Sequence, residues 1–243
     1  MSQLFFMFFL LLSNIAAGLA FLLWKEDALP AKETPRPACD VRTFGLVCSL
    51  AALLALPAAG LPESIIYLSL LSLLLGLTIF ASRWVKHLTP AASAVALLLL
   101  VYQGFFLRPA FDGIKSSMLS VTGVIPLLLL TCGSLAMGAE LLHWFGRKQT
   151  EPRYIWLLRI CLACQLLILA LVPCAGENAA PALQFMGLYW MDTQLYWAGV
   201  LSTGVSIGLT FMGKSTLPFH FVLIFFSMFC VRISLARLYF LIQ

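Results

Sequence analysis

Long apolar stretches, separated by short breaks with charged residues, proline or glycine, are the feature that most constrains this sequence. The first stretch runs from Leu4 to Trp24 without a charged residue. A helix that crosses a lipid bilayer needs about 20 mostly apolar residues. The chain has 243 residues, of which 62% are hydrophobic and 10% are charged, whereas soluble domains are roughly 45–50% apolar and about 25% charged. The composition excludes a soluble globular protein and leaves no room for a separate soluble domain.

Eight apolar stretches have the length and composition of transmembrane helices. We predict an all-α fold, a polytopic integral membrane helix bundle of about eight transmembrane helices in a single transmembrane domain over residues 1–243. Pro90 is interpreted as the break before the fourth helix. The predicted helices cover residues 4–24, 43–60, 64–82, 91–107, 118–142, 154–174, 195–213 and 218–240.

The distribution of lysine and arginine predicts the orientation of this bundle, because cytoplasmic loops are enriched in both residues. Ten of the 15 lie in the odd-numbered loops, two lie in the even-numbered loops and three lie inside predicted helices. Both termini are therefore expected outside, away from the cytoplasm. No lysine or arginine precedes the first helix, and the charges begin after it at Lys25, so we interpret it as a retained span rather than a signal peptide.

Several classes of function are disfavoured by what the sequence lacks. The net charge is +5, but no stretch is basic enough to bind nucleic acid. No glycine-rich phosphate loop, zinc-ligand cluster or nucleophile elbow is found. A haem in a membrane cytochrome needs facing ligands, usually paired histidines, and His87, His143 and His220 are expected in a loop and at helix ends. We predict no catalytic residue, no metal site and no cofactor held by this chain.

The cysteines do not indicate a disulfide framework, because they are odd in number and mostly lie inside apolar stretches. Cys161 and Cys164 have the spacing of a thiol redox motif, but both lie in the predicted sixth helix, so we interpret them as packing residues. The seven cysteines are Cys39, Cys48, Cys132, Cys161, Cys164, Cys174 and Cys230.

Charged residues near one surface form the main candidate site. In the predicted topology Arg108 ends the fourth helix at the outer surface, Glu63 and Asp112 lie in outer loops, and Arg237 lies about one turn from the outer end of the last helix. Arg232 lies deeper. Intramembrane arginine is costly and often functional, so these residues predict a patch that binds an anionic or quinone-type head group, with Arg as hydrogen-bond donor and Glu63 or Asp112 as proton acceptor.

A structural interpretation of the same residues stays open. Arg108 and Arg237 could extend to the membrane surface, and the buried charges could form ion pairs between helices. On the predicted cytoplasmic side, Glu140 in the fifth helix and Arg159 in the sixth are expected to form a structural ion pair, because their helices are joined by a short loop.

Three stretches of this sequence resemble the membrane anchor subunit of dimethyl sulfoxide reductase-type molybdoenzymes. They are Ser13–Leu23, the segment from Arg108–Asp112 to Val124–Leu127 with the small residues of Gly133–Gly138, and Arg232–Leu241. The number of helices, the outward termini and the order of the segments match over most of the chain. Arg237 matches the arginine in the last helix of the family, and Arg108 matches the arginine that ends the fourth.

The resemblance implies a haem-free anchor in the bacterial inner membrane that oxidises menaquinol. Electrons would pass to an iron–sulfur subunit and then to a molybdopterin catalytic subunit, so the iron–sulfur clusters and molybdopterin belong to partner chains. The sequence departs from the family at two places. Ile233 stands where the family has an acidic residue, and residues 56–62 lack the expected histidine, which leaves Glu63 as the nearest ionisable residue.

Two other classes of function explain the same residues. A small-molecule or anion transporter of the inner membrane would use the intramembrane arginines to bind its substrate, although we find no inverted halves in the sequence. An assembly or scaffold protein would need no small-molecule site, and its arginines would serve stability alone.

Overall fold

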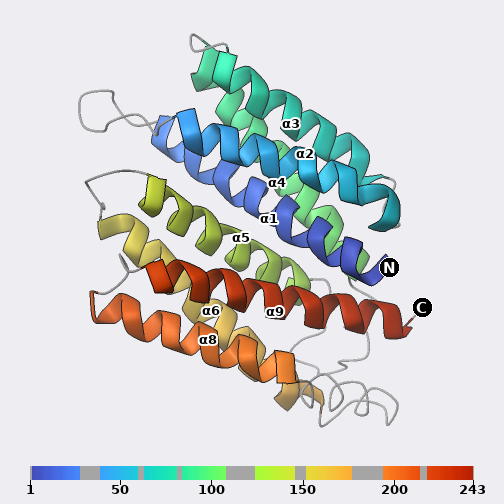
Figure 1. Cartoon of the computed structure of the whole chain (residues 1–243), viewed down its shortest axis with the longest axis vertical. Coiled ribbons are helices and arrows are strands. Elements are labelled where there is room, and N and C mark those ends of the chain that lie inside the picture. Colours follow the sequence, from blue (N-terminus) through green and yellow to red (C-terminus); the bar gives the residue numbers. More distant parts are fainter. Residues whose placement is uncertain are drawn as a thin grey trace. The chain divides into compact units, whose positions relative to one another are not determined.

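We analysed a computed structural model of the chain, which describes residues 2–27, 39–59, 63–80, 84–107, 124–145, 152–176, 194–213 and 218–242. This part of the chain contains eight α-helices and no strand, so the all-α prediction is confirmed at this level (Figure 1). The helices are α1 (Ser2–Asp27), α2 (Cys39–Ala59), α3 (Ser64–Phe80), α4 (Val85–Leu107), α5 (Val124–Phe145), α6 (Pro152–Gly176), α8 (Gln194–Phe211) and α9 (Pro218–Ile242).

The helix boundaries follow the apolar stretches closely, with one correction. Pro90 does not precede the fourth helix but lies inside α4, which begins at Val85. A proline this close to a helix start removes only one intrahelical hydrogen bond, the bond to the carbonyl of residue 86. The fifth helix begins at Val124 in the described part of the chain, and the predicted start at residues 118–123 lies outside it.

The chain forms two compact units. The first comprises residues 1–101 and 134–158, and the second comprises residues 102–133 and 159–243. In the first unit α2 packs against both α1 and α3, and in the second unit α8 packs against α9. The prediction of a single transmembrane domain stays a prediction.

Small residues bring α1 and α5 close together inside the first unit. A Cβ atom added at Gly18 would lie 1.8 Å from the carbonyl oxygen of Ser134, and one added at Gly138 would lie 2.7 Å from the carbonyl carbon of Gly18. Only glycine fits such a backbone contact, as in other membrane-type helix pairs with small residues at the interface. Gly18, Ser134 and Gly138 therefore form the packing surface between these two helices.

Hydrogen bonds between side chains add to these helix contacts in the first unit. The Ser134 hydroxyl on α5 donates to Oδ1 of Asn14 on α1 at 2.8 Å. The Ser72 hydroxyl on α3 donates to the Ser49 hydroxyl on α2 at 2.9 Å. All four side chains are buried, and buried polar groups are stable when they are hydrogen-bonded in this way.

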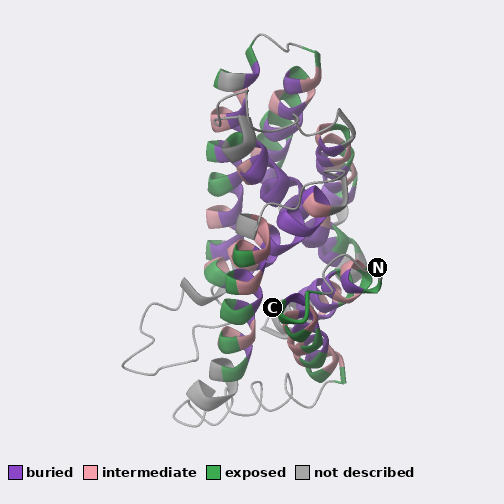
Figure 2. Cartoon of the chain, turned by 90° about the vertical axis from the view of Figure 1, so that its left-hand side faces the viewer, coloured by how far each residue is buried: buried purple, intermediate pink, exposed green. Residues whose placement is uncertain are grey.

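In the second unit α8 buries its polar side and exposes its apolar side. The buried residues are Tyr196, Gly199, Ser202, Thr203, Ser206 and Thr210, whereas Trp197, Leu201, Val205 and Phe211 are exposed. Figure 2 shows buried and exposed residues on different sides of individual helices. This arrangement is the reverse of a surface helix in a soluble protein.

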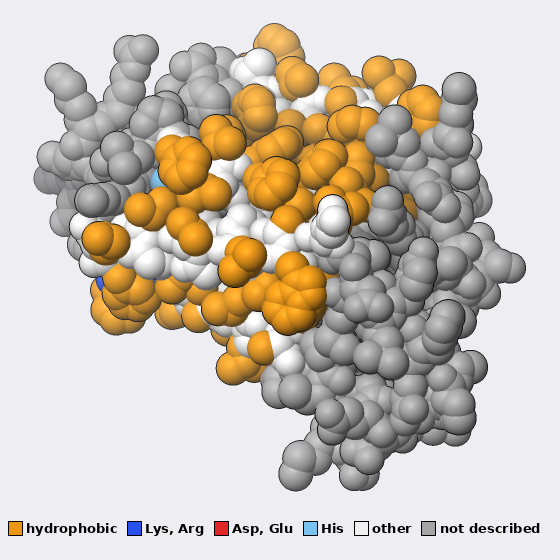
Figure 3. All heavy atoms as spheres, turned by 60° about the horizontal axis from the view of Figure 1, so that its bottom comes forward, with side chains coloured by type: hydrophobic (Ala, Val, Ile, Leu, Met, Phe, Trp, Pro, Cys, Tyr) orange, Lys and Arg blue, Asp and Glu red, His pale blue; other side chains and the backbone are white. Residues whose placement is uncertain are grey.

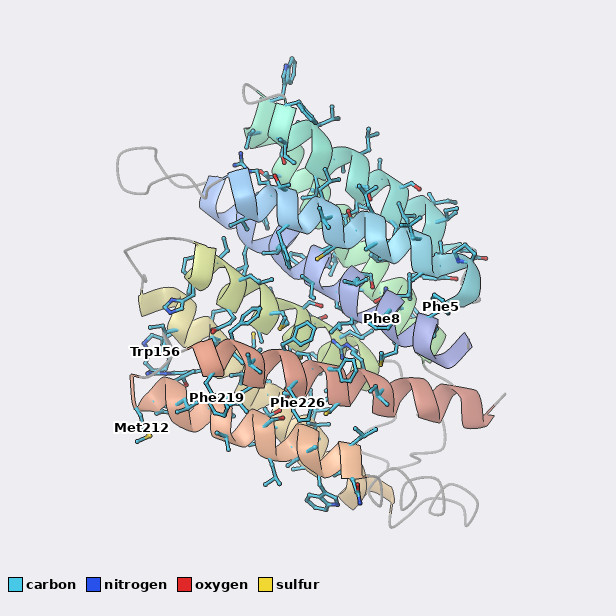
Figure 4. The ribbon with its side chains drawn as sticks, viewed as in Figure 1. Phe5, Phe8, Trp156, Met212, Phe219 and Phe226 are labelled. Atoms are coloured by element: carbon cyan, nitrogen blue, oxygen red, sulfur yellow. The ribbon has the colours of Figure 1, made fainter. Side chains whose placement is uncertain are left out.

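Exposed apolar side chains also occur on other helices. Leu54 on α2 and Phe80 at the end of α3 are 84% and 86% exposed. Hydrophobic side chains cover most of the described part of the face shown in Figure 3. Figure 4 labels six exposed examples, and Met212 there points away from the ribbon; the six are Phe5, Phe8, Trp156, Met212, Phe219 and Phe226.

Two helical segments in the described part of the chain, Phe5–Trp24 and His87–Phe105, are long and apolar enough to cross a membrane. This finding rests on length and composition, and a buried core helix passes the same test. Association with a membrane is therefore indicated weakly by these two segments alone. Five further apolar segments are shorter within the described residues.

Replacing Gly18 with leucine should disrupt the first unit, because the added side chain cannot fit against the Ser134 backbone. Overpacking typically costs about 1–3 kcal/mol, and the backbone contact here offers no flexible side chain that could move aside. We expect a clear loss of folded chain in detergent, measured by size-exclusion chromatography after heating. Gly208, where an added Cβ meets nothing within 4 Å, provides the matched control as Gly208→Leu. Equal stability of the two variants would contradict the close contact.

Candidate functional site

Arg232 carries a charged side chain that is only 1% exposed. It lies on α9, and its Nη2 donates to the carbonyl oxygen of Leu130 on α5 at 3.4 Å. Its Nε and Nη1 have no hydrogen-bond partner among the described residues. A buried charge is costly unless it is paired and hydrogen-bonded, so Arg232 offers two donors to a further group.

Gly133 on α5 leaves the space that the Arg232 guanidinium occupies. A Cβ atom added at Gly133 would lie 2.7 Å from Nη2 of Arg232 and 2.9 Å from the sulfur of Met228. Met228 and Arg232 are four residues apart and therefore lie on one side of α9. Any larger residue at position 133 would have to displace one of these two side chains, so Gly133 keeps the space that the guanidinium occupies.

Three cysteine thiols interact with one another in the second unit, and one of them, Cys132, also interacts with Arg232. The Cys132 thiol on α5 is hydrogen-bonded to Cys164 on α6 and interacts electrostatically with Arg232. Cys161, one turn before Cys164, interacts with both of the other thiols. The spacing of Cys161 and Cys164 was recognised in the sequence. The contact between Cys132 and Cys164 was not predicted, because the two residues lie on different helices.

The Arg232 arrangement can bind a group that accepts hydrogen bonds. Guanidinium N–H groups form strong, directional bonds to carboxylate, phosphate and polarised carbonyl oxygens. In the part of the chain that the structure describes, no group of three or more His, Cys, Asp and Glu is arranged to hold a metal ion. The residues in place therefore favour binding of an anion or a carbonyl compound at Arg232.

The described residues do not test whether the other members of the predicted outer patch lie near Arg232. Glu63 is exposed just before α3 in the first unit, and its carbonyl accepts a hydrogen bond from the Ile66 N–H at 3.3 Å. Arg237 lies on α9, but its side chain is outside the described part, as are Arg108 and Asp112 altogether. A patch of these five residues stays a prediction.

The predicted ion pair between Glu140 and Arg159 also stays a prediction. Glu140 is fully buried on α5 in the first unit. Arg159, in the second unit, contacts the end of α8: its Nη2 donates to the Thr210 carbonyl at 2.6 Å, and its guanidinium carbon lies 4.6 Å from the centre of the Phe211 ring. The contact with α8 was missed from the sequence, since a polar backbone acceptor and a cation–π contact leave no pattern in it.

A second cluster that sequence analysis missed joins α6, α8 and α9 in the second unit. Nε2 of Gln165 donates to the Thr203 hydroxyl at 3.4 Å and to the Ser227 hydroxyl at 3.3 Å. The hydroxyl groups of Thr203 and Ser227 are hydrogen-bonded to each other at 2.5 Å. All three side chains are buried. The serine and threonine spacing on α8 was visible in the sequence, but the partners on α6 and α9 were not.

Comparisons of this chain with protein-family models, with curated proteins and with solved structures found no match.

The thiol contact provides a test of the helix packing around Arg232. In membranes that contain a variant with only Cys132 and Cys164 retained, we expect an oxidant such as copper phenanthroline to form one intramolecular disulfide, because the two thiols already touch. Loss of thiol alkylation and a cross-linked peptide in mass spectra would measure it. A variant that retains only Cys164 serves as the control, because it cannot form an intramolecular disulfide. Equal loss of thiol alkylation in both variants would contradict the packing of α5 against α6.

Proposed function

We propose that this chain is a haem-free membrane anchor subunit of a respiratory molybdoenzyme complex similar to dimethyl sulfoxide reductase. It anchors an iron–sulfur subunit and a molybdopterin catalytic subunit to the bacterial inner membrane and passes electrons from menaquinol to them. The observation that carries this proposal is the buried guanidinium of Arg232. No described residue is hydrogen-bonded to its Nε or Nη1, so both N–H groups can donate to a ligand.

A quinone head group suits this site chemically. Its two carbonyl oxygens accept hydrogen bonds, and its apolar body is compatible with a surrounding of apolar helices. Negative charge develops on the oxygens as protons leave the quinol, and a fixed guanidinium stabilises that charge in a low-dielectric site. Arg232 would therefore bind and orient the head group and stabilise its deprotonated forms. Arginine keeps its own proton, so the proton acceptor has to be another residue.

The distribution of polar and apolar side chains supports a multi-pass membrane protein with both termini outside. Helix α8 buries its hydroxyl groups and exposes tryptophan, leucine and phenylalanine. Lipid accepts exposed apolar side chains without cost, whereas hydroxyl groups need hydrogen-bond partners within the protein. The excess of lysine and arginine in the odd-numbered loops supports the orientation.

The resemblance to the anchor family supports the identity of the partner subunits. It rests on Ser13–Leu23, Arg108–Asp112, Gly133–Gly138 and Arg232–Leu241. Two residues of this resemblance, Gly133 and Arg232, contact each other in the second unit. The iron–sulfur clusters and molybdopterin are expected in the partner subunits, and menaquinol is the substrate of the anchor.

An inner-membrane anion transporter is the second candidate, and the same observation favours it. A buried guanidinium with open donors binds a carboxylate or phosphate as readily as a quinone. The two candidates differ in their partners. An anchor requires an iron–sulfur subunit to receive electrons, whereas a transporter works alone and exchanges its anion across liposomes.

Purification of the tagged chain from native membranes in mild detergent separates these candidates. For an anchor we expect two further subunits in stoichiometric amounts by mass spectrometry, together with iron and molybdenum in the same sample. A chain that purifies alone and free of both metals would overturn the anchor proposal. Counterflow of candidate anions into liposomes that contain that chain would then support the transporter.

Replacing Arg232 with leucine should lower quinol-dependent turnover while leaving the fold intact. Hydrogen bonds to charged groups contribute about 1.5–3 kcal/mol, so we expect quinol-dependent turnover of the complex to fall roughly tenfold to hundredfold. Removal of an incompletely paired buried charge is often neutral or stabilising, so thermal stability should stay the same or rise. Assembly is checked by two measurements. The complex should still turn over with a soluble electron donor to the catalytic subunit, and the partner subunits should still co-purify.

Arg159→Gln is the matched control, because Arg159 lies in the same unit but contacts the α8 carbonyl end instead. It should leave quinol-dependent turnover close to that of the unchanged complex. Loss of turnover in Arg159→Gln but not in Arg232→Leu would remove Arg232 from the quinol site.

A further inference from the structure

A line of polar groups lies between α6, α8 and α9 in the second unit. The buried residues of α8 recur every three or four residues, from Tyr196 to Thr210, and so lie on one side of the helix. Fourteen residues of helix correspond to about 21 Å at 1.5 Å per residue. That length covers most of the hydrocarbon core of a bilayer, which is about 30 Å thick.

The line has contacts at four levels. At one end the Tyr196 hydroxyl donates to the Leu169 carbonyl of α6 at 2.5 Å. The second level is the cluster of Gln165, Thr203 and Ser227. One turn further along α8, the ring of His220 on α9 is hydrogen-bonded through Nε2 to the Ser206 carbonyl at 3.2 Å. At the far end Arg159 donates to the Thr210 carbonyl.

Helix packing alone explains part of this line. Serine and threonine hydroxyls between membrane helices often donate to a carbonyl of their own helix. Here Ser202 donates to the Ala198 carbonyl, Thr203 to the Gly199 carbonyl and Thr210 to the Ile207 carbonyl. These hydroxyl groups need no further donor partner, although their oxygens still accept hydrogen bonds.

Two buried atoms in the middle of the line are not explained by packing. Oε1 of Gln165 and Oγ of Ser206 have no hydrogen-bond partner among the described residues, and both side chains are fully buried. Their levels are adjacent, because Thr203, which binds Gln165, lies one turn from Ser206 on α8. Buried polar atoms in proteins are normally paired, with water where protein offers no partner. Both atoms therefore point to water bound between the second and third levels.

We propose that α6, α8 and α9 form a proton path, in which water bound by Gln165 and Ser206 joins the hydroxyl cluster of Thr203 and Ser227 to the level of His220. Each hydroxyl or water in the path accepts a proton on one side and releases one on the other, so no bond other than O–H or N–H bonds forms or breaks. The path belongs to this chain alone and does not depend on the proposed anchor function.

Protons suit this path better than metal cations. Its described members are hydroxyl, amide, imidazole and guanidinium groups, and none is a carboxylate. Hydroxyl groups are both donors and acceptors and can therefore relay a proton. A metal cation would need several oxygen ligands around one point.

The experiment uses the full chain in liposomes with a pH-sensitive dye inside. A potassium gradient with valinomycin sets the membrane potential, and the rate of internal pH change measures proton flux. We expect flux above that of protein-free liposomes, and we expect Gln165→Leu and Ser206→Ala each to lower the excess flux at least tenfold. Ser206→Ala removes one hydroxyl that has no hydrogen-bond partner among the described residues, so it should leave the fold intact.

Ser49→Ala is the matched control, because it removes a buried hydroxyl from the first unit, where Ser72 donates to it. It should conduct like the unchanged chain. The proposal is overturned by flux no greater than that of protein-free liposomes, or by unchanged flux in both Gln165→Leu and Ser206→Ala. Circular dichroism and size-exclusion profiles of each variant exclude misfolding as the cause of a loss.

Discussion

The buried charge of Arg232 is the constraint on which the candidate site depends. A guanidinium cannot be made neutral at ordinary pH, so its surroundings have to supply hydrogen bonds and space. The structure supplies one carbonyl, from Leu130, and the space beside Gly133. The guanidinium of Arg159, in contrast, has both a carbonyl and an aromatic ring against it. Under the proposed function, the Nε and Nη1 donors of Arg232 bind the quinol head group.

The cost of burying a polar group without a partner also explains which side chains lie between helices and which are exposed. Where helices are surrounded by apolar solvent, polar groups have no partner outside the protein, and they gather between helices. The hydroxyl of Ser134 meets Asn14, the hydroxyls of Ser72 and Ser49 meet each other, and Thr203 meets Ser227. Glycine permits the closest of these approaches, at Gly18. Exposed side chains such as Leu54 and Phe80 complete the pattern.

The sequence predicted the helices well and their partners poorly, for one physical reason. Hydrophobic length alone identifies a helix such as α9, so its bounds of Pro218–Ile242 lie close to the predicted 218–240. The pairing of helices depends on which face meets which neighbour, and α9 is apolar around most of its circumference. Arg232 was recognisable because a charge in an apolar run is costly. Its neighbours Leu130 and Gly133, and the partners of Gln165, come from distant segments that no periodicity relates. Pro90 was misplaced because a proline near a helix start resembles one in a loop.

Quinol oxidation would use both the proposed quinol site at Arg232 and the proposed proton path. Oxidation of a quinol releases two electrons and two protons, and the electrons leave through a partner subunit. The protons need an acceptor at the site, and Arg232, already protonated, cannot be one. Ser227 lies five residues before Arg232 on α9, about 7.5 Å along the helix axis, and belongs to the hydroxyl cluster with Thr203 and Gln165. A path that begins there could take protons that the arginine cannot hold. The second unit would then contain both a group that stabilises the deprotonating quinol and a route that removes its protons, with α9 contributing to each.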